Sequence, residues 1–183
     1  MKIGSAFALL TPLFLASACT SGGTSSAGSA ATPAPMAKAM LSAGDGAARG
    51  EATMSEVPGG LSVKVMAVGV SPGTHAVHIH TTGACAGPDF TSAGGHWNPA
   101  AHQHGRDNPA GMHMGDLPNM VVGANGVGEI EYLVPGGVLN GGAMPLFDAD
   151  GAAIVIHAQA DDYKTDPTGN AGGRIACGVL APG

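Results

Sequence analysis

Short segments in which apolar and polar residues alternate are the feature that most limits how this chain can fold. In residues 61–66, Leu, Val and Val alternate with Ser, Lys and Met, and glycine and proline bound the segment on both sides. A period of two places every second side chain on one face and predicts a half-buried strand. Further strands are predicted at 38–42, 48–55, 75–80, 117–123, 129–132, 153–158 and 174–180. Several short strands separated by turn residues indicate an all-β fold, an antiparallel sandwich or barrel.

The composition agrees with this fold class and excludes others. Gly (31) and Pro (13) make up about a quarter of the 183 residues, about twice the usual share of roughly 12 %. Charged residues are only 11 % of the chain, too few for a coiled coil or a long helical repeat. The formal net charge is -6 at pH 7, and no basic run is present. We therefore expect no nucleic-acid partner.

The N-terminal residues predict an exported protein. Residues 1–18 have the organisation of a signal peptide, with Lys2 followed by an apolar run that is too short to span a bilayer. The small residues at 16–18 form a cleavage site, and Cys19 follows them directly. This segment resembles a bacterial lipobox, so we expect Cys19 to be lipidated. Ordinary secretion after residue 18 is the alternative.

A low-complexity segment separates Cys19 from the remainder of the chain. Residues 19–35 consist largely of Ser, Gly, Ala and Pro, which cannot bury apolar surface, so we expect a flexible tether. The folded domain is predicted to comprise residues 36–183. We expect it in the periplasm or cell envelope, held at a membrane only through the N-terminal lipid.

The histidines are clustered in a way that predicts metal binding. All eight lie between residues 75 and 157. His78 and His80 are two apart on a predicted strand and so point to one face, and His157 ends another strand. Each histidine alone could be an ordinary surface or core residue with a hydrogen-bond partner. Together they favour a site for a soft or borderline metal ion.

A second group of potential ligands lies in the long segment 81–116, which shows no strand period. A loop of this length in a small domain usually has a function. It can wrap several side chains around one ion, and three histidines with one aspartate suit tetrahedral Zn²⁺. The residues of this group are His96, His104, His113 and Asp116.

Beyond Cys19, only Cys85 and Cys177 are present. In an exported protein, two cysteines indicate one disulfide, which would join the start of the long loop to the last predicted strand. The alternative is that both thiolates bind metal. Because the histidine and aspartate ligands already suffice, we favour the disulfide.

The ordered motifs resemble those of the copper-zinc superoxide dismutases in their exported bacterial form. The resemblance covers about 100 residues directly and rests on an ordered set of histidines, aspartate, cysteines and arginine. The motifs are His75-Ala76-Val77-His78-Ile79-His80, Gly95-His96-Trp97-Asn98-Pro99, His113-Met114-Gly115-Asp116-Leu117, Val155-Ile156-His157, Ala160-Asp161-Asp162 and Gly169-Asn170-Ala171-Gly172-Gly173-Arg174-Ile175-Ala176-Cys177-Gly178.

This resemblance implies an eight-stranded Greek-key β-barrel or sandwich with two long functional loops, and one copper and one zinc per subunit. It implies that Asp161 hydrogen-bonds a copper-side and a zinc-side histidine together, that Arg174 binds the anionic substrate, and that Cys85 and Cys177 form the family disulfide. His102 has no counterpart and is expected to be a solvated loop residue. The implied metal ligands are His78, His80, His96 and His157 for copper, and His96, His104, His113 and Asp116 for zinc.

The implied activity is the dismutation of superoxide to hydrogen peroxide and dioxygen at the copper, with His96 moving a proton, as a defence against superoxide outside the cytoplasm. A homodimer is compatible with the resemblance. Two other functions remain open from the residues alone. One is a non-enzymatic copper- and zinc-binding envelope lipoprotein, which would have no need of Asp161 or Arg174. The other is an interaction domain whose metals are structural, which would leave His78, His80 and His157 without a role.

Overall fold

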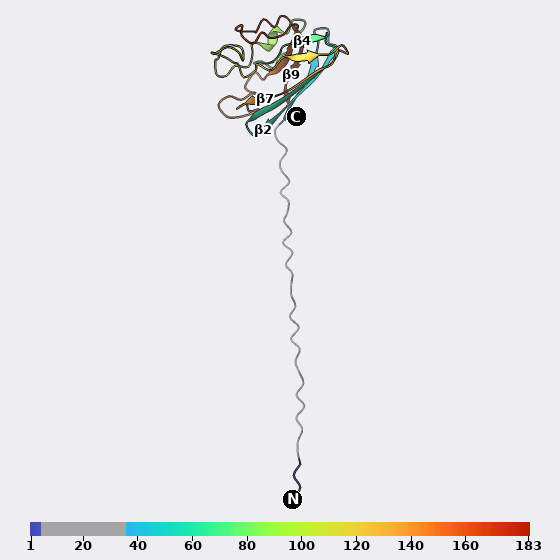
Figure 1. The fold of residues 1–183 in the computed structure, drawn as a ribbon, viewed down its shortest axis with the longest axis vertical. Helices are drawn as coiled ribbons and strands as arrows, with labels where there is room; N and C mark the ends of the chain where they lie inside the picture. Colours follow the sequence, from blue (N-terminus) through green and yellow to red (C-terminus); the bar gives the residue numbers. More distant parts are fainter. Residues whose placement is uncertain (5–35) are drawn as a thin grey trace. The chain divides into compact units, whose positions relative to one another are not determined.

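The computed structural model describes residues 1–4 and 36–183 (Figure 1). Cys19, the predicted tether and most of the predicted signal peptide lie outside the described residues. Within residues 36–183 the chain forms one antiparallel sheet and a short 3-10 helix, η1 (Thr91–Ala93). The strands are β1 (Met36–Ser42), β2 (Ala48–Val57), β3 (Gly60–Ala67), β4 (Gly73–His75), β5 (Val77–His80), β6 (Met120–Val122), β7 (Gly128–Pro135), β8 (Ala153–His157), β9 (Arg174–Val179) and β10 (Ala181–Pro182).

The sheet closes into a barrel because its two edge strands are consecutive in the chain. The strand order is β4-β6-β7-β3-β2-β1-β9-β8-β5, with β10 paired to β1. Only Ala76 separates β4 from β5. Its N–H donates to the carbonyl of Gln159, and its carbonyl accepts from the N–H of His157. The connections β3–β4 and β7–β8 join strands that are not neighbours, as in a Greek key.

The predicted all-β, eight-stranded architecture is confirmed. Ten strands reduce to eight when β4 and β5 are taken as one strand bent at Ala76, and β10 as the continuation of β9 beyond Leu180. Two of the predicted strands differ most from the observed ones. The strand expected at 117–123 is limited to β6 (Met120–Val122), and the one expected at 75–80 is interrupted at Ala76. No helix in the described part of the chain is long and apolar enough to span a bilayer.

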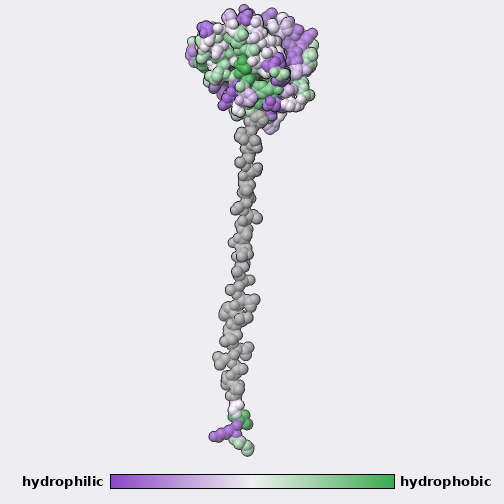
Figure 2. Space-filling model, turned by 180° about the vertical axis from the view of Figure 1, so that it is seen from behind, coloured by the Kyte–Doolittle hydropathy of each residue, from purple (hydrophilic) through white to green (hydrophobic). Residues whose placement is uncertain are grey.

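Alternating side chains explain the core. In β3, buried Leu61, Val63 and Val65 alternate with more exposed residues, as their sequence predicts. They pack inside the barrel with Ile79 of β5 and other apolar residues. Outside the barrel, apolar and polar residues are interspersed on the face seen in Figure 2. The sequence alternation therefore assigns the inner and outer faces of these strands.

Strands β5 and β8 differ from the others because every residue in them is buried. Their inner faces supply Ile79 and Ile156 to the barrel core. Their outer faces are covered by the loops of residues 81–119 and 158–173. His78 and His80 of β5 are on this covered outer face, since successive strand residues point to opposite sides. The fold thus creates a polar cluster between the barrel wall and two loops.

Candidate metal centre

Four buried histidines from three parts of the fold meet on the outer face of the barrel. His78 and His80 come from β5, and His157 ends β8. His96 lies in the long loop, where its backbone pairs with that of His80 in an isolated antiparallel β-bridge. The ring centroids of His78 and His96 are 3.9 Å apart, and those of His78 and His157 are 4.9 Å apart. One potential ligand atom from each of the four residues lies within 4.8 Å of the others.

In each of these rings, one nitrogen is held by the protein and the other is left without a partner. His78 Nε2 contacts Asp161 Oδ2 at 2.7 Å, His80 Nδ1 donates to the Gly94 carbonyl at 2.9 Å, and His157 Nδ1 donates to the Gly172 carbonyl at 3.3 Å. The opposite nitrogens are His78 Nδ1 and Nε2 of His80, His96 and His157, and none of them has a hydrogen-bond partner in residues 1–4 and 36–183.

Unpartnered buried nitrogens are costly, and most buried polar atoms have a partner. A cation bound between these four nitrogens would give each of them a partner. Imidazole nitrogens also suit copper well. The residues present therefore fit a copper ion.

A second group surrounds one oxygen of Asp116. The Oδ1 atom of Asp116 lies 2.9 Å from Nδ1 of His96, 3.0 Å from Nδ1 of His104 and 3.2 Å from Nδ1 of His113. The other oxygen, Oδ2, accepts the N–H groups of Gly105 and His113, each at 3.0 Å. Three imidazoles and one carboxylate oxygen at these separations fit a four-coordinate Zn²⁺ ion. His96 belongs to both groups, with Nδ1 toward Asp116 and Nε2 toward His78 and His80.

Burial sets the protonation of the first group. It lowers the pKa of His80 to about 2, that of His96 to about 4 and that of His157 to about 3. These imidazoles are therefore neutral at pH 7 and their lone pairs are available.

His104 of the second group behaves in the opposite way. Burial lowers the pKa of His104, but hydrogen bonds to Asp116 and Asp161 outweigh it and raise that pKa to about 9. Although burial raises the pKa of Asp116, its histidine neighbours hold it well below the usual range. Negative charge concentrated here attracts a proton, and equally a metal cation.

Asp161 connects the two groups directly. Its Oδ2 lies 2.7 Å from His78 Nε2, and its Oδ1 lies 2.9 Å from His104 Nε2. Both carboxylate oxygens are thus occupied by ring nitrogens, one from each group. This contact fixes which nitrogen of each ring faces away, toward the candidate metal position.

We expect Asp161→Asn to weaken copper binding by roughly tenfold or more, because an amide cannot accept from both rings at once. Competition with a copper chelator would measure the dissociation constant. Asp45→Asn is the matched control, since Asp45 is exposed in the β1–β2 turn, where it accepts the N–H of Ala47. Equal copper affinity in the Asp161 variant and in the control would remove Asp161 from the centre.

Arg174 lies at the opening to the histidine cluster. It lines a cavity of about 340 Å³ together with His80, His96 and His157. Its Nη1 donates to the carbonyl of Phe90 and its Nη2 to that of Gly94, each at 2.6 Å. Two fixed hydrogen bonds orient the guanidinium, and its remaining N–H groups can bind a small anion.

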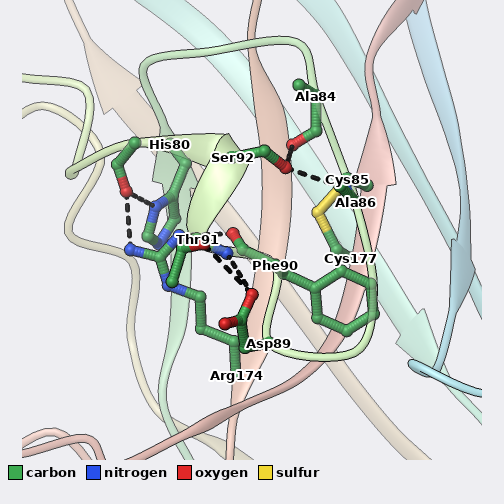
Figure 3. The surroundings of a disulfide bond; sticks show 11 residues. His80, Ala84, Cys85, Ala86, Asp89, Phe90, Thr91, Ser92, Arg174 and Cys177 are labelled. Carbon is green, nitrogen blue, oxygen red and sulfur yellow. Dashed lines mark hydrogen bonds between the residues drawn. A yellow bond between two sulfur atoms is a disulfide. The ribbon is translucent and has the colours of Figure 1, made fainter.

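The predicted disulfide between Cys85 and Cys177 is present and supports this arrangement (Figure 3). It fastens the loop that carries Phe90 and Gly94 to β9, whose first residue is Arg174. The carbonyl of Gly94 accepts from both His80 and Arg174. The disulfide, the anion-binding group and a candidate copper ligand are therefore mechanically linked.

The structure brings together every predicted ligand, and it adds residues that sequence reasoning missed. Asn119 is hydrogen-bonded to the backbone of Asp161 in both directions, and its N–H donates to the hydroxyl of Tyr163. Gly169 has φ +65° and passes so close to Asp161 that a Cβ would collide with the carboxylate. The Gly169-Asn170-Ala171 stretch was singled out by resemblance, but nothing in the sequence indicated these contacts.

His102 lies apart from both groups. It is exposed, as expected, and its Nδ1 is 3.1 Å from the carbonyl of Met112. Asp166, which the sequence did not single out, accepts the backbone N–H of His104.

Comparisons with known proteins agree on one family. The sequence model described as copper/zinc superoxide dismutase (SODC) matches residues 48–180. The chain is 46 % identical over 147 residues to superoxide dismutase [Cu-Zn] of Caulobacter vibrioides, covering 79 % of this chain and 84 % of the relative. It is 44 % identical over 138 residues to superoxide dismutase [Cu-Zn] 2 of Aquifex aeolicus, covering 74 % of this chain and 81 % of the relative.

Solved structures give the same result for the fold. The crystal structure of a superoxide dismutase-like protein from Bacillus subtilis matches with a TM-score of 0.75 and 41 % sequence identity. The match covers 79 % of this chain and 97 % of that chain.

Proposed function

Because the chain belongs to the copper/zinc superoxide dismutase family, we propose that its two groups of buried ligand atoms are the copper and zinc sites of the enzyme. The chain converts two superoxide anions and two protons into one dioxygen and one hydrogen peroxide. The proposed copper ligands are His78 Nδ1 and the Nε2 atoms of His80, His96 and His157. The proposed zinc ligands are the Nδ1 atoms of His96, His104 and His113, and Oδ1 of Asp116.

One observation carries this assignment: the buried ring nitrogens that have no protein partner are the same atoms that converge. Among the described residues, four ring nitrogens are in this condition, namely Nδ1 of His78 and Nε2 of His80, His96 and His157. Each faces another potential ligand atom of its group. Ordinary structural histidines would be satisfied by hydrogen bonds on both sides.

When bound by these residues, copper would supply a Cu(II)/Cu(I) couple for electron transfer between two superoxide ions, whereas zinc would be redox-inert. The chain supplies binding, orientation and protons. Arg174 attracts the superoxide anion into the cavity beside His80 and His157. His96 Nε2 would take and give up one of the two protons that hydrogen peroxide requires, in the state in which this nitrogen does not bind copper. Asp161 holds His78 and His104 in the required ring orientation.

A metal assay combined with an activity assay tests this function. The oxidised protein from residue 36 onward, loaded with copper and zinc, is expected to hold one of each and to dismute superoxide, and the metal-free protein is expected to be inactive. A protein that binds both metals but does not dismute superoxide would instead be a copper- and zinc-binding envelope protein. That alternative is disfavoured because it does not need a guanidinium that lines the same cavity as His80, His96 and His157.

We also propose that the enzyme acts outside the cytoplasm, at the cell envelope, held by a lipid on Cys19. The support is the sequence alone: a cleavage site followed at once by cysteine, and then a segment without apolar residues to bury. A homodimer, compatible with the resemblance, is tested by the mass of the purified protein in solution.

Cys19→Ser is expected to move the enzyme from the membrane fraction to the soluble fraction of the native host, with its activity intact. Several acyl chains together anchor a protein stably, and a serine cannot receive them. Mass spectrometry of the mature N-terminus measures the modification directly. An unmodified chain beginning at Cys19 in the soluble fraction would establish ordinary secretion instead.

A further inference from the structure

Three partly exposed methionines line a cavity that adjoins the two-metal centre, with His113 in its wall. The cavity has a volume of about 370 Å³, and its walls include Met112 and Met114 from the long loop and Met144 from the loop that precedes β8. Methionines usually fill gaps in a core, as fully buried Met54 and Met120 do in this barrel. Met112, Met114 and Met144 instead are only partly buried and line this cavity.

An imidazole lines the same cavity in a defined orientation. His102 Nδ1 lies 3.1 Å from the carbonyl of Met112. A carbonyl can only accept, so this contact places a hydrogen on Nδ1 and leaves the lone pair on Nε2. Among the described residues, no hydrogen bond to His102 Nε2 is present. The nitrogen that can bind a metal is therefore unoccupied by protein.

The chemistry of this cavity selects one class of ion. Thioethers are soft, uncharged ligands that select Cu(I), and imidazole is compatible with them. The cavity walls contain no carboxylate, so they lack the charged oxygen ligands that hard divalent cations prefer. We propose that Met112, Met114 and Met144, with Nε2 of His102, bind a third metal ion, a soft monovalent ion such as Cu(I).

The cavity lies next to the proposed zinc site. Met112 and Met114 flank His113 in sequence, and His113 reaches both the cavity and Asp116. An ion held by the thioethers would lie beside the loop that supplies the zinc ligands. The site would let the protein collect scarce monovalent copper separately from the two metals of the centre.

Titration of the copper- and zinc-loaded protein with Ag(I) tests this site. Ag(I) is a redox-inert probe with the softness of Cu(I). We expect one Ag(I) per chain, with copper and zinc still retained at one each by elemental analysis. The ¹³C-methyl resonances of Met112, Met114 and Met144 should shift on binding, and those of Met54 and Met120 should not.

Leucine variants separate the sulfur atoms from the apolar shape. The triple change Met112→Leu, Met114→Leu and Met144→Leu keeps a similar volume and should abolish the silver site. His102→Gln should weaken it roughly tenfold. The matched control Met36→Leu, Met40→Leu and Met66→Leu should leave it unchanged.

Several results would overturn the proposal. One is a wild-type protein that binds no silver beyond its two metals, and another is a cavity triple variant that binds silver as tightly as the control. A third is a change in solution mass caused by the triple variant with no silver bound by wild type, since the cavity would then be a contact between copies of the chain. Because the methyl resonances are read on the unaltered protein, they decide the matter even if a variant fails to fold.

Discussion

Removing the Cys85–Cys177 disulfide is expected to lower the free energy of unfolding by about 4 kcal/mol. The bond closes a loop of 92 positions in sequence, and a cross-link over that length removes much conformational freedom from the unfolded chain. For a domain of this size the melting temperature should fall by roughly 10 °C. Calorimetry of the oxidised protein, the reduced protein and a Cys85→Ala/Cys177→Ala variant would measure it.

Removing the disulfide should also affect the position of Arg174 in the proposed active site. The carbonyls of Phe90 and Gly94 hold Arg174, and both residues lie in the loop that the disulfide fastens. Figure 3 shows Phe90 and Arg174 beside the disulfide. We therefore expect a lower kcat/KM in the reduced protein at temperatures where it remains folded. Cys19→Ser is the matched control, because it removes a cysteine outside the disulfide. Identical melting of oxidised and reduced protein would show that the bond contributes nothing to stability.

Arg174→Ala is expected to reduce kcat/KM for superoxide roughly 30-fold at low ionic strength while both metals stay bound. The guanidinium is the cation that lines the cavity with the proposed copper ligands. Losing one charge-assisted contact to an anion costs about 2 kcal/mol in the transition state. Initial rates of superoxide decay, with metal analysis of the same sample, give both quantities.

Two variants make the Arg174 result specific. Arg174→Lys keeps the charge but cannot donate to Phe90 and Gly94 as a planar fork, so it should restore only part of the rate. Arg49→Ala removes an equal charge from β2, where the guanidinium donates to the neighbouring carbonyl of Ala48. Should Arg174→Ala retain the wild-type kcat/KM, or should Arg49→Ala lose as much, local anion binding at Arg174 would be ruled out.

Most of the barrel could be predicted because half-buried strands show their burial in the sequence. Alternation located β3 and β7 with small errors in their ends. The bend at Ala76 could not be predicted, since it depends on hydrogen bonds to Gln159 and His157 far along the chain. Closure of the sheet is a tertiary property and leaves no local period.

The residues whose side chains are the candidate ligands could be predicted from the sequence, whereas the backbone groups that position them could not. Histidines spaced two apart on a strand, and a loop with four more, indicated two ligand groups that the structure brings together. The carbonyls of Phe90 and Gly94 could not be foreseen, because any residue type offers a carbonyl. Asn119 was missed for a similar reason: its contacts are with the backbone of Asp161.

Anomalous diffraction at the copper and zinc absorption edges from crystals of the loaded, oxidised protein tests the central claim most directly. We expect one copper bound by His78 Nδ1 and by Nε2 of His80, His96 and His157. We expect one zinc bound by Nδ1 of His96 and by the other ligands proposed for it, so that both metals share the imidazole of His96. A single metal position, or a copper ion not bound by His96, would contradict the account.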